Sequence, residues 1–121
     1  SGRSRTIPDG NQPEAAVDLG SFDANPRGTQ ARLLVRASVT LAVAPAAAQG
    51  EIQDDRTIDR VKDAVIWELA NATYDEVSSA DGRDKVKARM RDRSNDFLYQ
   101  GQVGGVYFGE FVLQALPGFD I

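Results

Sequence analysis

The sequence predicts one domain of the α+β class, with strands towards both ends of the chain and helices between them. Residues 33–43 alternate apolar and polar or small side chains, which is typical of a half-buried strand. Residues 58–70 repeat apolar side chains at helical spacing, and residues 106–114 form a second strand-like stretch. Strands and helices segregated along the chain in this way are typical of α+β domains.

The length and composition are sufficient for a single hydrophobic core without disulfide bonds. The 121 residues are 41% hydrophobic and 26% charged, and they include no cysteine and no histidine. The lack of these two residue types removes disulfides, thiol chemistry, the commonest general base and the commonest metal ligand. The net charge of −4 argues against a general affinity for nucleic acid, which needs a basic surface.

The chain divides into three parts by composition. Residues 1–12 are polar and rich in Gly and Pro, so we expect a disordered lead-in. Residues 13–116 are predicted to form the domain, and residues 117–121 a C-terminal tail. No apolar run reaches the ~18 residues that span a membrane. The first two residues, Ser-Gly, resemble a cloning remnant, which leaves room for an anchor or signal ahead of them.

Two strands are expected before the helices. Val17, Leu19 and Phe22 predict a first strand, and a turn at residues 25–28 follows it. The second strand is the clearest element of the chain, because one of its faces is apolar throughout. That face consists of Leu33, Val35, Ala37, Val39, Leu41 and Val43. We expect this strand to stop at Pro45 and residues 46–55 to form a loop.

Three helices are expected in the middle of the chain. Thr57 is the predicted N-cap of a helix over residues 58–70. Thr73 and Glu76 match a capping box, which predicts a short helix to about Ser79. Asp81-Gly82 is expected to break the run before a third helix over residues 83–99. The apolar stripe of that third helix consists of Val86, Met90 and Phe97.

The last strand is expected to be apolar on both faces. A flexible connection at residues 101–105 leads into residues 106–114. Simple alternation places Val106, Phe108 and Val112 on one face, and Tyr107, Phe111 and Leu113 on the other. A strand of this kind is covered on both sides, by helices, by a second chain or by both. Glu110 within it either points to an open edge or pairs with an arginine.

The segment from Arg83 to Arg93 opposes the acidic balance of the chain. It holds six basic residues and two acidic ones, Asp84 and Asp92. One interpretation is the solvated face of a helix. The other is a docking patch for an acidic partner, or less readily for nucleic acid.

The sequence offers no candidate for catalysis, cofactor binding or metal binding. Asp54 and Asp55 are adjacent, so they cannot share one face of a strand, and a loop pair of this kind is usually solvated. Asp81 and Asp84 bracket a helix start, where acidic residues are expected for capping and for the helix dipole. We therefore expect a protein that is not an enzyme and works by binding other chains.

Several segments, taken in order, resemble the family of the flagellar basal-body-associated protein FliL. The stretch 101–114, with Val106-Tyr107-Phe108 and Glu110-Phe111-Val112, resembles the strand that closes the periplasmic domain of that family. Residues 33–43 resemble its long second strand, residues 58–66 its first helix, and residues 72–87 its following Lys-Thr and Glu-Gly-Lys segment. Departures from the family pattern are Gly109 in place of Thr, Pro26 in place of Leu, and no Pro at the first helix start.

The resemblance implies a fold and a place in the cell. The implied fold is a curved, mostly antiparallel sheet with helices packed on it, similar to the SPFH domain of stomatin. Members of the family are single-pass inner-membrane proteins with this domain in the periplasm, at the flagellar basal body. By the resemblance we expect an N-terminal anchor ahead of this sequence. Members associate with stator proteins and self-assemble into rings that support motility.

Residues are carried over from the family only as candidates for fold and assembly. Tyr107, Phe108, Glu110 and Phe111 are the first group, for which plain core packing is the competing role. Arg83, Lys87 and Arg91 are the second group, as a contact surface. Two other functions stay open: a stomatin-like membrane scaffold or paralogue without a link to motility, and a hydrolase with Asp and Glu pairs. Nothing in the sequence brings two carboxylates together for the latter.

Overall fold

A three-stranded sheet lies against a layer of helices in the computed structural model, which describes residues 14–119. The strands are β1 (Ala15–Ala24), β2 (Leu33–Ala44) and β3 (Gln102–Ala115), in the order β1-β2-β3, and both pairings are antiparallel. The helical segments are η2 (Ala46–Ala48), α1 (Gln49–Ile52), α2 (Asp55–Asn71), α3 (Tyr74–Val77) and α4 (Ala80–Asn95). The predicted α+β class with an antiparallel sheet is confirmed. The predicted lead-in over residues 1–12 lies outside the described residues.

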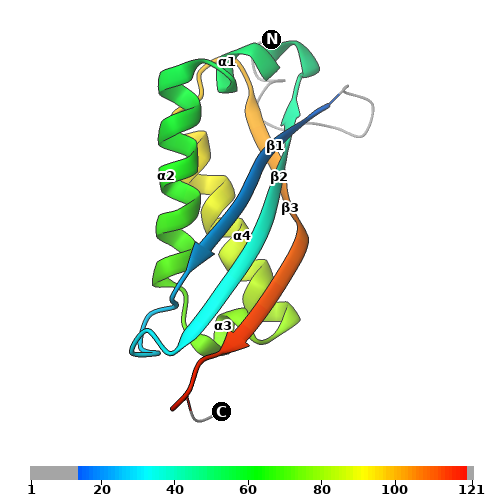
Figure 1. Cartoon of the computed structure of the whole chain (residues 1–121). Helices are drawn as coiled ribbons and strands as arrows, with labels where there is room; N and C mark the ends of the chain where they lie inside the picture. Colours follow the sequence, from blue (N-terminus) through cyan, green and yellow to red (C-terminus); the bar gives the residue numbers. More distant parts are fainter. Residues whose placement is uncertain (1–13, 120–121) are drawn as a thin grey trace.

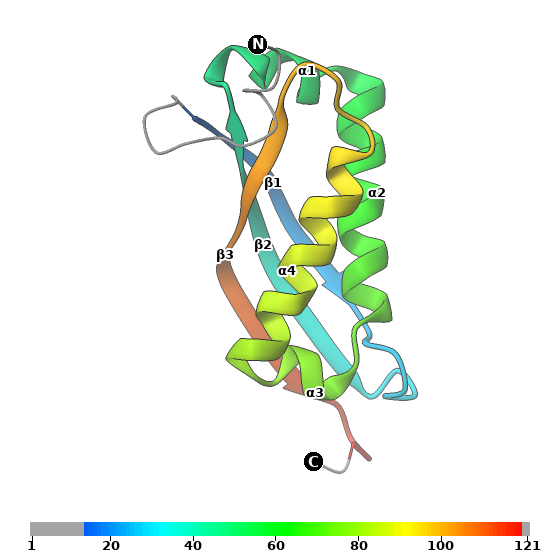
Figure 2. The same ribbon diagram turned by 180° about the vertical axis from the view of Figure 1, so that it is seen from behind.

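The helices cover one face of the sheet only. Figure 1 shows the three curved strands in front of α4, and Figure 2 shows α2 and α4 in front of the strands from the opposite side. The other face of the sheet has no helix over it in the described part of the chain. No helix within residues 14–119 is long and apolar enough to cross a membrane.

The central strand β2 follows the sequence pattern closely. All six residues of the predicted apolar face are buried, at 0–1% exposure. Because side chains alternate between the two faces of a strand, a slip of β2 by one residue would move this whole set to the wrong face. The strand ends at Ala44, directly before Pro45, as predicted.

A bulge explains the uneven apolar spacing in β1. The register of β1 against β2 shifts between Asp18 and Gly20, where Gly20 has a φ of +88° that favours glycine. Asp18 Oδ1 accepts a 2.8 Å hydrogen bond from the Gly20 N–H. The extra residue lets Val17 and Leu19 be buried and still turns Phe22 towards the core.

The predicted loop at residues 46–55 is wrong, because the chain turns helical directly after Pro45. Residues 46–52 form η2 and α1, and Ile52 in α1 is fully buried. The predicted N-cap Thr57 is also wrong. Asp54 is the N-cap, because its carboxylate accepts from the Thr57 N–H at 3.4 Å, and α2 starts at Asp55.

The capping box at Thr73 and Glu76 is confirmed, since each side chain accepts from the backbone N–H of the other residue. The predicted break at Asp81-Gly82 is wrong, because Ser79 is the N-cap of α4 and Gly82 lies in its first turn. A Cβ on Gly82 would stand 2.4 Å from the Glu76 Cα, so this glycine permits close contact between α3 and α4. The helix α4 ends at Asn95, four residues earlier than predicted.

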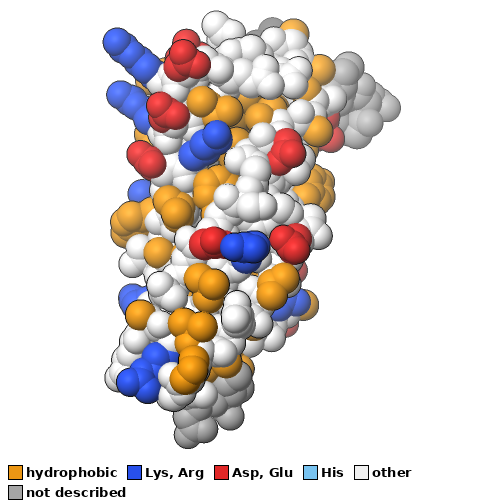
Figure 3. Space-filling view, in the orientation of Figure 1, with side chains coloured by type: hydrophobic (Ala, Val, Ile, Leu, Met, Phe, Trp, Pro, Cys, Tyr) orange, Lys and Arg blue, Asp and Glu red, His pale blue; other side chains and the backbone are white. Residues whose placement is uncertain are grey.

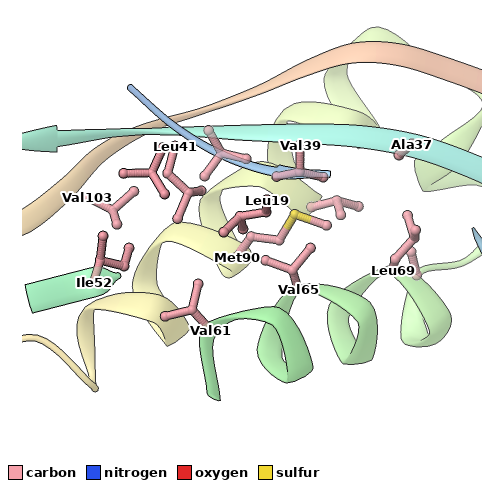
Figure 4. Packing of buried hydrophobic residues seen from close by; sticks show 14 of the residues in the cluster. Leu19, Ala37, Val39, Leu41, Ile52, Val61, Val65, Leu69, Met90 and Val103 are labelled. Carbon is pink, nitrogen blue, oxygen red and sulfur yellow. The ribbon is translucent and has the colours of Figure 1, made fainter. Parts of the chain in front are cut away.

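The core lies between the sheet and the helix pair α2 and α4. Figure 4 shows Met90 of α4 between Val65 of α2 and the strands, close to Leu19 and Val39. Val86 and Met90, two members of the predicted stripe, are buried on α4. Phe97, the third, lies beyond the helix and packs partly buried against the same cluster.

Candidate functional site

The long edge strand β3 holds most of the predicted site residues, and its path differs from the prediction. The strand begins at Gln102, so the segment 102–105 is paired strand and not a flexible connection. Its register against β2 shifts twice, once beside Gly104 and once at Gly109-Glu110. Between the pairs Ala37/Phe111 and Val39/Phe108, two residues of β3 face Ser38 alone. Ser38 Oγ accepts from the Glu110 N–H at 2.6 Å within this bulge.

The bulge brings Phe108 and Phe111 to the same face of the sheet. Simple alternation predicted opposite faces, and that prediction is wrong because the extra residue restores the inward direction after Glu110. The two rings are partly buried against the core, with ring centroids 5.0 Å apart. Among the described residues the helices cover the inner face of β3 only, so the expected cover of its other face by a second chain stays a prediction.

Arg83 and Lys87 of α4 cover these two rings. The Arg83 guanidinium carbon lies 5.5 Å from the centre of the Phe111 ring, and Lys87 Nζ lies 5.1 Å from that of Phe108. Cations above aromatic faces are attracted to the ring quadrupole. Arg83 also donates a hydrogen bond to the Val77 carbonyl, at 3.1 Å. These two residues therefore close the edge of the core and are not free cations on a solvated face.

Two further basic residues of α4, Arg89 and Arg93, face α2 and α3. Arg89 donates two hydrogen bonds to the Glu76 carboxylate, both at 2.9 Å, and one to Glu68 at 3.1 Å. Arg93 donates to the second oxygen of Glu68 at 2.8 Å and stacks over Trp67, with 4.3 Å to the ring centre. Glu68 is 5% exposed, so its burial depends on these two arginines.

The ion pair between Glu76 and Arg89 shifts the pKa values of both residues. Hydrogen bonds from Arg89 are the main cause that holds the pKa of Glu76 below its ordinary value, and the Thr73 N–H adds to this effect. The pKa of Arg89 is raised chiefly by Glu76. Arg91, the remaining candidate of the basic segment, pairs with its neighbour Asp92 at 2.9 Å on the surface.

The uncovered face of β2 and β3 brings together a different set of side chains, which we call the open sheet face. It consists of Leu34, Arg36, Tyr107, Glu110, Val112 and Gln114. All except Tyr107 line a shallow hollow of about 250 Å³. Tyr107 and Val112 are 58% and 45% exposed, so large apolar surface lies in water here. Figure 3 shows this side of the molecule, with apolar patches interrupted by acidic and basic side chains.

Charge on the open sheet face is organised around Arg36. Its guanidinium makes two hydrogen bonds to Asp23 of β1, at 2.8 and 3.0 Å. These bonds are the first cause of the raised pKa of Arg36 and the lowered pKa of Asp23, and the charge of Glu110 adds to the former. Glu110 is exposed and forms no ion pair among the described residues. Glu110 is therefore exposed as one alternative predicted, and its pairing with an arginine of a neighbouring chain stays a prediction.

The structure thus separates the predicted site residues into two groups. Phe108, Phe111, Arg83 and Lys87 form one structural cluster, whereas Tyr107 and Glu110 lie on the open sheet face. Arg91 belongs to neither group and pairs with Asp92 on the surface of α4. Sequence reasoning missed Leu34 and Arg36 on that face, and it missed Glu68. The available indication for Glu68 was its position seven residues after Val61 and three after Val65, on the apolar side of α2.

Within residues 14–119, no group of three or more acidic side chains is placed to hold a metal ion. The arrangement of the open sheet face offers exposed aromatic and aliphatic surface with a few charges. Such surface is suited to contact with another protein, because large apolar patches on a water-exposed face commonly mark interaction sites.

Comparisons with known proteins agree with the segments that led to the resemblance. The family model described as "Flagellar basal body-associated protein FliL" matches residues 16–114. The "Flagellar protein FliL" of Aquifex aeolicus (strain VF5) is 33% identical over 94 residues, which cover 78% of this chain and 57% of that protein. The protein of the same name from Bacillus subtilis (strain 168) is 38% identical over 55 residues, covering 46% of this chain and 39% of the relative. The chain therefore spans about half the length of these relatives or less.

Proposed function

Because the chain belongs to the family of the flagellar basal body-associated protein FliL, we propose that it is the part of a flagellar motor accessory protein that contacts other proteins. The observation that supports this most is the open sheet face, where Tyr107 and Val112 expose apolar surface beside Glu110 and Arg36. Surface of this kind is suited to association with another protein.

The proposal includes partners and a location. We propose that the domain lies in the periplasm, linked to the inner membrane by an N-terminal anchor, and that it associates with stator proteins of the flagellar motor. We further propose that copies self-assemble around the stator and support torque. Membrane anchoring raises the effective concentration of such a domain, so weak contacts between copies suffice for assembly.

The genetic test is deletion of the gene followed by complementation. We expect cells without the gene to swim poorly under high load, and the unaltered gene to restore them. Normal swimming of the deletion strain at every load would contradict the proposed role.

A matched pair of tyrosine variants then tests the surface. Tyr107→Ala removes the exposed ring of the open sheet face, whereas Tyr99→Ala removes a ring that is 80% exposed and lies outside the sheet. We expect only Tyr107→Ala to lower swimming and the recovery of stator protein in pull-down experiments. If the two variants swam equally well and recovered equal amounts of stator protein, the open sheet face would not be the contact surface.

A further inference from the structure

The helices α2 and α4 lie side by side (Figure 2), and an exposed tryptophan lies where they meet. Trp67 of α2 is the only tryptophan of the chain, and half of its surface is exposed. Arg93, in the last turn of α4, lies over its ring. These two residues line a hollow of about 300 Å³, which we call the tryptophan hollow, together with Arg60, Asp63, Ala64 and Phe97. Its volume is at the lower end of the range for ligand pockets, about 300–1,000 Å³.

The guanidinium of Arg93 is held in place, but only one of its three nitrogens has a protein partner. Its Nε donates to the buried carboxylate of Glu68 at 2.8 Å, and its carbon lies 4.3 Å from the centre of the Trp67 ring. No described residue accepts a hydrogen bond from its Nη1 or Nη2. Arg89 differs, because all three of its nitrogens donate to Glu68 or Glu76. With its side chain 41% exposed, Arg93 therefore presents two donors in a fixed position.

The two unused donors of Arg93 match the two oxygens of a carboxylate. Arginine binds this group through two parallel hydrogen bonds, and a guanidinium that is already held loses little freedom on binding. Beside these donors, the hollow presents the apolar side chains of Ala64, Trp67 and Phe97. A ligand that carries an apolar side chain next to its carboxylate can therefore fill both parts of the site. Tryptophan and arginine are also the residues that contribute most at protein interfaces.

The charges around the hollow favour a single carboxylate over a polyanion. Arg60 in the lining forms no ion pair with a described residue, so it adds positive charge beside Arg93. Asp63 lines the same hollow, and Asp92 and Asp96 line the neighbouring one. These carboxylates would repel a nucleic acid or an anionic membrane, each of which presents many negative charges at once.

From these observations we infer that the tryptophan hollow binds a segment of another protein in which an Asp or Glu side chain stands next to a large apolar side chain. The carboxylate accepts hydrogen bonds from Nη1 and Nη2 of Arg93, and the apolar side chain packs against Trp67. The hollow is formed by the helix layer, away from the open sheet face. It is thus a second contact surface, and the inference goes beyond the surface named in the proposed function.

Trp67 itself reports binding, because the indole N–H of a single tryptophan gives one signal in a heteronuclear NMR spectrum. The probe is the peptide Gly-Leu-Glu-Gly, acetylated and amidated so that its glutamate carries its only charge. The matched peptide has Gln in place of Glu, which keeps the shape and removes the charge. We expect the Glu peptide to shift the indole signal at millimolar concentrations. The Gln peptide should bind roughly tenfold more weakly, because charged hydrogen bonds are lost.

Two lysine variants of α4 test the role of Arg93. Arg93→Lys keeps a positive charge near Glu68 but loses the planar fork, so the affinity for the Glu peptide should fall roughly tenfold. Arg91→Lys, two residues earlier on the same helix, is the matched control and should bind as wild type does. Urea unfolding checks that both variants fold. If Arg93→Lys did not fold, the comparison of the two peptides on the unaltered protein would still decide.

Several results would overturn the inference. The absence of a shift, or equal affinity for the Glu and Gln peptides, would mean that the hollow does not recognise the carboxylate. Equal affinity of wild type and folded Arg93→Lys would remove the fork from the site. An equal shift with inorganic phosphate would indicate a plain anion site, and a shift with protein concentration alone would make a second copy the occupant. None of these results affects the swimming of the deletion strain, so the inference and the proposed function fail separately.

Discussion

The two faces of β3 show how one strand serves both the core and the surface. On the inner face, Phe108 and Phe111 pack together under the cations of Arg83 and Lys87. On the open sheet face, Tyr107 and Val112 stand half exposed beside Glu110. The residues of the two faces are adjacent in sequence and similar in type, so hydrophobicity alone does not separate them. The bulge at Gly109-Glu110 separates them, because it changes which residues point inward.

The largest expected effect comes from the inner face. Phe111→Ala should lower the free energy of unfolding by about 2–3 kcal/mol, less than the 3–5 of a fully buried ring because this ring is only partly buried. Urea unfolding measures the change. Val112→Ala is the matched control from the open sheet face and should cost less than about 0.5 kcal/mol. Equal losses would show that the two faces do not differ.

The contrast between the two faces of β3 also explains which parts of the fold could be predicted from the sequence. The pattern in residues 33–43 predicted β2 correctly, because a central strand with one buried face keeps strict alternation. The capping box at Thr73 and Glu76 was predictable because its contacts are local. The face of the sheet on which Phe111 lies was not predictable, because it depends on the register in which β3 pairs with β2. Gly109 inside a strand was the only local indication of a bulge.

Helix starts were missed for a related reason. Asp54 and Thr57 are both good N-caps by residue type, and only the path of α1 decides between them. Gly82 resembles a helix breaker in sequence, yet tight packing against Glu76 keeps it in the first turn of α4. On the candidate site, Tyr107 and Glu110 were identified, but Leu34 and Arg36 come from another strand and become neighbours only in the folded sheet.

The next effect concerns the side of α4 that faces away from β3. Glu76→Gln keeps a capping acceptor at this position but loses the charge that binds Arg89. We expect a loss of about 1–2 kcal/mol in unfolding free energy at neutral pH, as for a hydrogen-bonded charged group. Urea unfolding at pH 7 measures it.

The same variant tests the pH dependence. The folded pKa of Glu76 lies below its ordinary value of 4.5, so the ion pair stabilises the fold above that value. This stability is lost as the pH falls below 4.5 towards the lower folded pKa. Wild type should therefore lose more stability than Glu76→Gln over this acid range. Parallel pH profiles of the two proteins would contradict the role of the charge.

A smaller effect is expected from the cations above the inner face. Lys87→Met keeps an apolar stem over Phe108 and removes the charge, and with it both the cation–π attraction at 5.1 Å and the ion pair with Asp84 at 3.9 Å. The expected loss is about 0.5–1 kcal/mol. Thermal unfolding should show this loss, and Lys85→Met, on an exposed position of the same helix, should show a smaller one. A gain in stability for Lys87→Met would mean that desolvation of the amine outweighs the attraction.

Tyr107→Ala is expected to have the smallest effect on stability and the largest effect on function. The ring of Tyr107 lies back over Gly105, since a Cβ there would stand 2.9 Å from the tyrosine hydroxyl. Covering an edge glycine in this way stabilises a strand weakly, so Tyr107→Ala should cost about 0.5 kcal/mol. Urea unfolding at neutral pH checks this value. A loss well above 1 kcal/mol would place Tyr107 with the inner-face residues as part of the fold, and a swimming defect of the variant would then report unfolding and not a lost contact.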